Sequence, residues 1–155
     1  MKNNIEILIP TLNEERNIQE VINELKQEGY NNITILDANS SDGTVEIAKT
    51  NDCKIILDDL GTSGFGTSII NGLKNLDHDY YCVFDGDKSF NPKAISEMLF
   101  EINLGADFVF GTRYLNNTKS EDDTLITKFG NFFFTKLINI LFKINTSDVL
   151  FFYVV

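Results

Sequence analysis

The chain of 155 residues is 43% hydrophobic and 23% charged, a composition that predicts one globular domain with a buried core. Its net charge of −10 argues against a nucleic-acid-binding protein, because phosphate backbones are recognised by a basic face. The charge still allows an anionic ligand that arrives with its own divalent metal. Cys53 and Cys82 lie in apolar runs, which predicts buried free thiols and a reducing, cytoplasmic compartment. No signal peptide and no apolar run of about 18 residues is visible.

Strand and helix patterns alternate along the chain, with apolar β-branched or aromatic runs between segments whose apolar residues recur three and four positions apart. In chain order we expect a strand at 5–9, a helix at 15–28, a strand at 33–36, a helix at 44–49, a strand at 54–57, a helix after 61–66, a strand at 80–84, a helix from Asn91 and Pro92 onward, a strand at 107–110 and a helix at 125–144. This order predicts an α/β fold with three α/β/α layers and a mostly parallel central sheet.

Ligands of such sheets bind at the carboxyl ends of the strands. The residues at the ends of the predicted strands are therefore the candidate site, and in chain order they are Pro10, Thr11, Asn13, Glu14, Asp37, Asp58, Asp59, Asp85, Asp87, Thr112 and Arg113. Several are carboxylates, which repel one another unless a cation lies among them. A divalent metal that also binds the phosphates of a ligand would remove this repulsion.

The sharpest single feature is Asp85-Gly86-Asp87, directly after the apolar run 80–84. Two carboxylates one residue apart can converge on one hard cation, and the glycine between them lets the backbone turn tightly. Asp and Gly are also common turn residues, so the three letters alone favour an ordinary turn. Their position at the end of a buried strand favours the metal site.

Glycines and an arginine form weaker features. Gly64 and Gly66 could let the backbone approach a phosphate or sugar, or could only shape a loop, while Gly72 could serve close helix packing. The guanidinium of Arg113 could pair with a diphosphate, or with one of the many surface acids. His78 lies at the opposite end of the predicted sheet, and we assign it no role.

The helix predicted at 125–144 is very apolar, with a polar stripe at Asn131, Thr135, Asn139 and Lys143. One interpretation is a helix buried against the sheet. The other is a surface that meets a membrane or a lipid acceptor, with Lys128, Lys136 and Lys143 near anionic headgroups. Because apolar residues occur on more sides of the helix than one sheet face can cover, we favour partial contact with lipid or a partner. The protein would then be peripheral on the inner face of the membrane.

Five segments occur in an order that resembles family 2 glycosyltransferases, and their spacing is similar to the dolichyl- or polyprenyl-phosphate mannosyl- and glucosyltransferase branch. They are the run from Ile7 to Glu15, the run from Ile35 to Thr44, Gly64-Phe65-Gly66, Asp85-Gly86-Asp87, and Gly111-Thr112-Arg113-Tyr114. The resemblance covers about residues 5–150. It implies a GT-A fold, a Rossmann-like nucleotide-binding sheet, with 1–155 as a single domain.

The resemblance also implies roles for individual positions. Residues matching Pro10, Thr11 and Glu14 line the nucleotide, the one matching Asp37 contacts the base or ribose, and Gly64 and Gly66 belong to the nucleotide-sugar site. Residues matching Asp85 and Asp87 hold Mg²⁺ or Mn²⁺ against the sugar diphosphate, Ser89 can add a metal or water contact, and Arg113 lies near the diphosphate or the acceptor phosphate. The implied reaction is inverting transfer of a hexose from UDP- or GDP-hexose to a polyprenyl or dolichyl phosphate or a cell-envelope glycan.

Three positions depart from the family pattern. Gly86 stands where alanine is usual, Ala38 stands where a second acid is common, and the chain stops at Val155, before the acceptor or membrane part that members usually carry. The alternative function is therefore a truncated domain that binds a nucleotide sugar without turnover.

Two rival interpretations rest on the segment 83–90. It is similar to the nucleophile strand of haloacid-dehalogenase-like phosphatases, but Lys88-Ser89 replaces the Gly-Thr expected there. Asp85, Asp87 and Ser89 also have the spacing of calcium ligands, although Phe90 stands where an EF-hand needs glycine.

Overall fold

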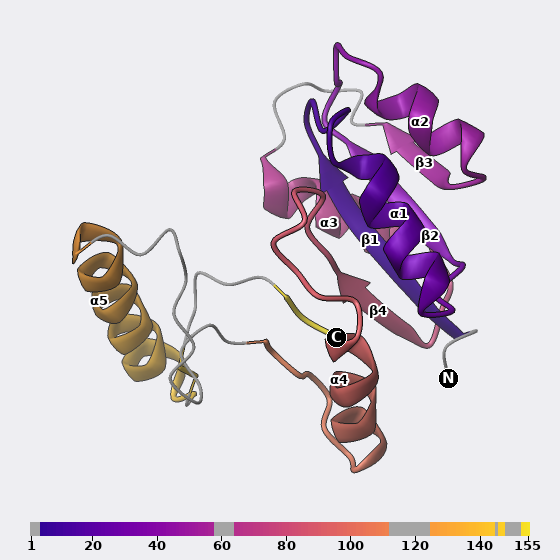
Figure 1. Ribbon diagram of the computed structural model, residues 1–155. Helices are drawn as coiled ribbons and strands as arrows, with labels where there is room; N and C mark the ends of the chain where they lie inside the picture. Colours follow the sequence, from indigo (N-terminus) through magenta and orange to yellow (C-terminus); the bar gives the residue numbers. More distant parts are fainter. Residues whose placement is uncertain (1–3, 58–63, 112–124, 145, 148–152) are drawn as a thin grey trace. The chain divides into compact units, whose positions relative to one another are not determined.

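The computed structural model describes residues 4–57, 64–111, 125–144, 146–147 and 153–155. The chain divides into two compact units, Met1–Val109 with Val154–Val155 and Phe110–Tyr153. The first unit contains the sheet and the second contains one long helix (Figure 1). Thr112, Arg113, Asp58 and Asp59, which the sequence places in the candidate site, lie outside the described residues.

The first unit alternates strands with helices, as the sequence predicts. Its elements are β1 (Ile5–Thr11), α1 (Ile18–Gln27), β2 (Ile33–Asp37), α2 (Thr44–Thr50), β3 (Lys54–Leu57), α3 (Phe65–Lys74), β4 (Tyr80–Val83) and α4 (Ala94–Asn103).

The four strands form one parallel sheet in the order β3-β2-β1-β4. Thr11 pairs with Asp37 in the register of β1 and β2, so the carboxyl ends of these two strands are level. Figure 1 shows α1 in front of the sheet and α3 behind it, so helices cover both faces. The predicted α/β architecture with a parallel central sheet is confirmed.

The core of this unit lies between the central strands and their helices. All but one of the residues of β1 are buried, and every residue of β2 is buried, which is the pattern of strands covered on both faces. The apolar residues predicted for one helical face, Ile18, Val21, Ile22 and Leu25, are all buried on α1. Burial of these side chains fixes where the strands end and therefore where the loops of the site begin.

The prediction of a helix that begins at Glu15 is wrong by about one turn. α1 begins at Ile18, after a turn in which the Asn17 and Ile18 amides donate to the Glu14 carbonyl at 3.0 and 2.9 Å. Asn13 has a φ of 60°, which no helical residue adopts. The backbone between β1 and α1 is therefore a loop shaped by contacts with other residues.

The segment predicted as a fifth strand, 107–110, does not extend the parallel sheet. Val109 instead exchanges two backbone hydrogen bonds, of 2.8 and 3.0 Å, with Val155. The neighbouring Val154 forms an antiparallel bridge with Val83 at the end of β4. The local pattern correctly predicts an extended segment, but its partner comes from a distant part of the sequence and runs in the opposite direction.

Close packing of α3 against β2 depends on Gly72. A Cβ added at this position would lie 2.9 and 3.0 Å from the two Cδ atoms of Leu36, which is itself buried. We expect Gly72→Val to lower the free energy of unfolding by about 1–3 kcal/mol, because the branched side chain overpacks this contact. The matched control is Gly66→Val on the same helix, where an added Cβ meets nothing within 4 Å. Urea denaturation of both variants checks the prediction, and equal losses would contradict it.

The second unit contains α5 (Leu125–Phe142). Its polar residues Asn131 and Thr135 are buried and joined by a 3.2 Å hydrogen bond, while Asn139 makes two hydrogen bonds with the backbone of Thr146. The exposed side chains of this helix include Phe129, Phe132, Phe133, Phe134, Leu137, Ile140, Leu141 and Phe142. Most of the apolar side chains described on this helix, from Phe129 onward, are therefore exposed. None of the helices in the described part of the chain has the length and hydropathy to cross a membrane.

Candidate functional site

The loop after β1 and the loop after β2 are joined by side-chain to backbone hydrogen bonds at the carboxyl edge of the sheet. The Glu14 amide donates to the Thr44 hydroxyl at 2.9 Å, and the Glu15 amide donates to Asp42 at 3.1 Å. The Glu15 carboxylate in turn accepts a 3.1 Å hydrogen bond from the Gly43 amide. Glu14 is thus held at a fixed position beside the ends of β1 and β2.

Asp37 ends β2 and is only 1% exposed. One carboxylate oxygen accepts hydrogen bonds from the hydroxyls of Thr11 (3.1 Å) and Ser40, and the other accepts from the Ser40 amide at 2.8 Å. In this structure Asp37 therefore links the end of β1 to the loop after β2.

The loop after β4 lies next to the end of β1 and the loop that follows it. A Cβ added at Gly86 would lie 3.4 Å from Cγ of Glu14 and 3.5 Å from Cγ2 of Thr11. The structure therefore brings Asp85-Gly86-Asp87 together with Thr11, the last residue of β1, and with Glu14 in the loop after β1. This grouping follows from the parallel pairing of β1 with β4, because the carboxyl ends of parallel strands open toward the same edge of the sheet.

Negative charge is concentrated in this group. Burial raises the pKa of the half-buried Asp85, and the nearby carboxylates of Asp87 and Glu14 raise it further. Among the described residues, neither Asp85 nor Asp87 forms an ion pair with a basic side chain. A divalent cation would compensate these charges, so the carboxylates fit a metal that prefers oxygen ligands.

The protein alone does not complete a metal site in the described residues. No group of three or more His, Cys, Asp or Glu side chains there is arranged to hold an ion. A metal bound by Asp85 and Asp87 would therefore need further oxygen ligands from a phosphate group or water, which is how Mg²⁺ is commonly held.

Aromatic packing and a salt bridge fix the ends of this loop. The rings of Phe84 and Phe90, both buried, meet edge to face with their centroids 5.5 Å apart. Between them, the Ser89 amide donates to Asp87 at 2.8 Å, and Lys88 pairs with Glu20 of α1. Asp87 and Ser89 are both exposed, so their oxygens are open to a ligand.

The remaining predicted residues are less constrained. Pro10 is half-buried in β1, next to Thr11. Gly64 and Gly66 are exposed at the start of α3, with no atom within 4 Å of an added Cβ. Gly64 has a φ of −72°, so the backbone there does not require glycine. The close packing at Gly72 fits the interpretation that this glycine serves helix packing.

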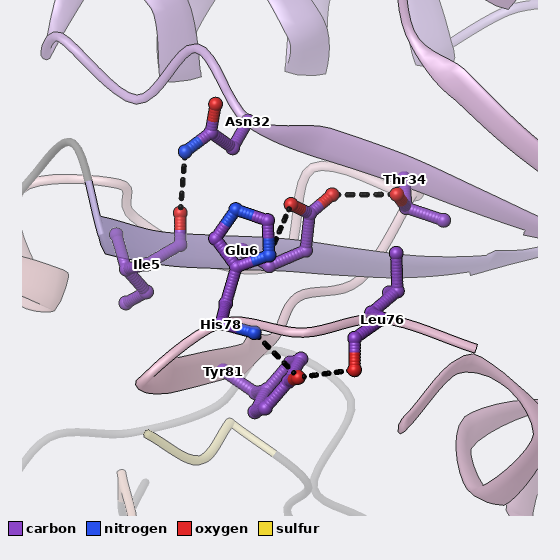
Figure 2. A network of polar contacts seen from close by, with 7 residues as sticks. All are labelled: Ile5, Glu6, Asn32, Thr34, Leu76, His78 and Tyr81. Atoms are coloured by element: carbon purple, nitrogen blue, oxygen red, sulfur yellow. Dashed lines mark hydrogen bonds and ion pairs between the residues drawn. The ribbon is translucent and has the colours of Figure 1, made fainter. Parts of the chain in front are cut away.

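A second polar network lies at the opposite edge of the sheet and was not predicted (Figure 2). Glu6 on β1 is buried, accepts a hydrogen bond from the Thr34 hydroxyl and lies 3.4 Å from Nδ1 of His78. The Tyr81 hydroxyl accepts from the His78 amide and donates to the Leu76 carbonyl, at 2.9 and 2.8 Å. Figure 2 shows that these contacts join β1, β2 and the loop before β4. His78 thus belongs to a structural network away from the candidate site.

Replacement of Gly86 by alanine should be tolerated. Its φ is not in the left-handed region, and an added Cβ would meet its neighbours at ordinary van der Waals distances of 3.4–3.5 Å. We expect Gly86→Ala to change the free energy of unfolding by less than about 1 kcal/mol and to leave metal binding intact. Gly105→Ala is the control, because Gly105 has a φ of 104° and should lose stability. Thermal denaturation with and without Mn²⁺ checks both variants, and a larger loss for Gly86→Ala would contradict the site geometry.

Comparison with known proteins identifies the family. A family model described as glycosyl transferase family 2 matches residues 6–154. The UDP-N-acetylglucosamine–dolichyl-phosphate N-acetylglucosaminyltransferase of Methanococcus voltae is 31% identical, over 82% of this chain and 59% of that protein. The dolichol-phosphate mannosyltransferase of Pyrococcus furiosus is 28% identical, over 76% of this chain and 35% of that protein. The chain therefore spans only part of the length of these relatives.

Solved structures show the same fold. Glucosyl-3-phosphoglycerate synthase from Mycobacterium tuberculosis, in complex with UDP, superposes with a TM-score of 0.68 at 19% identity, over 97% of this chain and 55% of that one. The same enzyme in complex with Mn²⁺, UDP-glucose and phosphoglyceric acid gives a TM-score of 0.57 at 22% identity, over 66% and 40% of the two chains. The fold predicted from the sequence, a GT-A fold, is confirmed.

Proposed function

The chain belongs to glycosyl transferase family 2, and from this premise we propose that it binds a nucleotide-diphosphate sugar at the carboxyl edge of its sheet and transfers the hexose with inversion. One observation carries the proposal. The structure places Asp85-Gly86-Asp87 against Thr11 and Glu14, and it leaves the carboxylates there without a cationic partner among the described residues. The family match also removes support from the phosphatase and calcium-loop interpretations.

The divalent metal in this proposal is Mg²⁺ or Mn²⁺, held by Asp85 and Asp87. Ser89, whose amide donates to Asp87, would add a metal or water contact. Bound there, it would supply Lewis-acid neutralisation of the leaving diphosphate. The Mn²⁺ and UDP-glucose in the structure of the mycobacterial synthase support this use of a metal.

The residues around the acidic loop have distinct proposed roles. Pro10, Thr11 and Glu14 line the nucleotide, and Asp37 holds Thr11 and Ser40 at the base or ribose. Gly64 and Gly66 offer an unobstructed backbone at the exposed start of α3 to the sugar diphosphate. Arg113, outside the described residues, would add a guanidinium near the diphosphate.

A polyprenyl or dolichyl phosphate is the proposed acceptor, with a cell-envelope glycan as the second candidate. Two relatives whose names include dolichyl or dolichol phosphate support the lipid phosphate. Such an acceptor is already ionised, so the reaction would need little help from a general base. The exposed phenylalanines of α5, with Lys136 on the same helix and Lys143 directly after it, support peripheral contact with a membrane that holds this acceptor.

A transfer assay tests the proposed function. The chain is incubated with UDP- or GDP-hexose labelled in the sugar, Mn²⁺ or Mg²⁺, and vesicles that contain polyprenyl phosphate. Metal-dependent appearance of label in the lipid fraction supports the proposal. Donor binding without transfer would support the alternative, a domain that binds the nucleotide sugar but has no turnover.

A further inference from the structure

The loop between β1 and α1 contains a residue whose side chain faces the neighbouring loop. Asn13 directly precedes Glu14 and has a left-handed backbone with a φ of 60°. We propose that Asn13 is a positioning residue, which fastens the loop 38–43 to the β1–α1 loop and so pre-forms the donor site. This inference rests on the proposed function for the part that concerns nucleotide-sugar binding. The contact between the two loops is observed directly in the hydrogen bonds of Asn13 with Ser40 and Ser41.

Asn13 contacts the neighbouring loop through both its backbone and its side chain. Its amide donates to the Ser40 hydroxyl at 2.9 Å, and its side-chain oxygen accepts from the Ser41 amide at 2.8 Å. The Ser41 hydroxyl lies 3.3 Å from the same oxygen. The Ser40 hydroxyl also donates to Asp37, so hydrogen bonds run without interruption from Asn13 to the buried end of β2.

Asn13 makes these contacts with its backbone in the left-handed region. Asparagine is one of the few residues other than glycine that tolerates this conformation, because its short polar side chain bonds locally. Asn13 does not cap a helix, because α1 begins at Ile18 and Asn17 occupies the cap position. The side chain of Asn13 is therefore used between loops and not within a helix.

The consequence for the site concerns Glu14. Its amide is bound to Thr44, and its side chain lies beside Gly86 of the acidic loop. If the two loops moved apart, Glu14 and Thr11 would no longer face Asp85-Gly86-Asp87 in one arrangement. A ligand that binds across these loops would then have to order them, which weakens binding.

Two glycine variants isolate the contribution of the Asn13 side chain. Asn13→Gly keeps the left-handed backbone accessible but removes the acceptor for the Ser41 amide. Asn39→Gly is the matched control, because Asn39 is also left-handed, with a φ of 67°, and the described part of the structure gives its side chain no hydrogen bond. Asn13→Asp is a rescue variant that keeps an acceptor at the same position and tolerates the same backbone.

We expect Asn13→Gly to speed amide hydrogen exchange at Ser41, measured by NMR. We also expect it to weaken UDP or GDP binding in the presence of Mn²⁺ by about five- to tenfold, which corresponds to the net contribution of one hydrogen bond. Asn39→Gly should leave both quantities near those of the wild type. Asn13→Asp should restore slow exchange at Ser41. All variants should keep similar melting temperatures, because the contact is local.

Three results would overturn the proposal. The first is an exchange rate of the Ser41 amide that is the same in Asn13→Gly and Asn39→Gly. The second is faster exchange in Asn13→Gly while its affinity for UDP or GDP stays at the wild-type value. The third is an equal loss of nucleotide affinity in both glycine variants. If the wild type binds neither nucleotide, the proposed function fails and the donor-site part of this proposal fails with it. The exchange rates at Ser41 still decide in that case whether Asn13 fastens the loop.

Discussion

Replacement of Asp85 by asparagine is expected to abolish metal-dependent donor binding and, at the same time, to raise the melting temperature near neutral pH. The carboxylate is half-buried next to Asp87 and Glu14, and its pKa is raised above the ordinary value of 3.8. Folding therefore disfavours its charged form. Asparagine removes that charge while its side-chain oxygen can still accept hydrogen bonds from the loop.

The pH dependence of this effect has a definite sign. Well below pH 3.8 the carboxyl is protonated in both folded and unfolded chains, and the variant should show no advantage. As the pH rises through the raised pKa of the folded state, the wild type loses stability that the variant keeps. Thermal denaturation of both proteins across acid and neutral pH measures the difference, without metal.

Asp87→Asn is the matched variant for the same prediction. Asp87 is exposed, so its replacement should change stability little. It should reduce metal-dependent transfer by about 100-fold or more, because one of the two carboxylates proposed to bind the metal is lost. If Asp85→Asn destabilised the protein, or if either variant kept metal-dependent binding at wild-type strength, the assignment of this site would be wrong.

Replacement of Phe84 by alanine should have the largest effect on stability, a loss of about 3–5 kcal/mol in the free energy of unfolding. Phe84 is 1% exposed, follows β4 directly and packs edge to face on Phe90. Its removal leaves a cavity between the sheet and the loop that carries Asp85 and Asp87. Phe84→Leu fills part of that space and should cost less.

The control for this prediction is Phe100→Ala on α4. Phe100 is 60% exposed, so the change should stay within about 0.5 kcal/mol. Chemical denaturation of the three variants gives the comparison. Equal losses for Phe84→Ala and Phe100→Ala would show that the Phe84–Phe90 contact does not hold the loop.

The parts of the fold set by local pattern could be predicted from the sequence. The apolar spacing of Ile18, Val21, Ile22 and Leu25 predicts the buried face of α1, and the β-branched runs predict the parallel strands. The candidate site follows from these elements, because the carboxyl ends of parallel strands share one edge. Thr11 and Glu14 therefore meet the acidic loop as the strand order implies.

Contacts between distant residues could not be predicted. The binding of Asn13 to the next loop depends on where Ser40 and Ser41 lie in space, and no local pattern indicates that position. The sequence around Glu6 does not indicate that this acid is buried, because its contacts with Thr34 and His78 are formed only in the folded chain. The antiparallel pairing of Val109 with Val155 likewise cannot be predicted locally, because the sequence of either segment alone indicates only an extended backbone and not its partner.

In the proposed function, the carboxyl edge of the sheet binds a nucleotide diphosphate together with a divalent metal. Calorimetric titration of the wild type and Asp87→Asn with UDP and GDP, with and without Mn²⁺, tests it most directly. We predict that the wild type binds one of the two nucleotides, that this binding requires Mn²⁺, and that Asp87→Asn loses the metal requirement together with most of the affinity. Binding that is equally strong without metal, or unchanged in Asp87→Asn, would contradict the account.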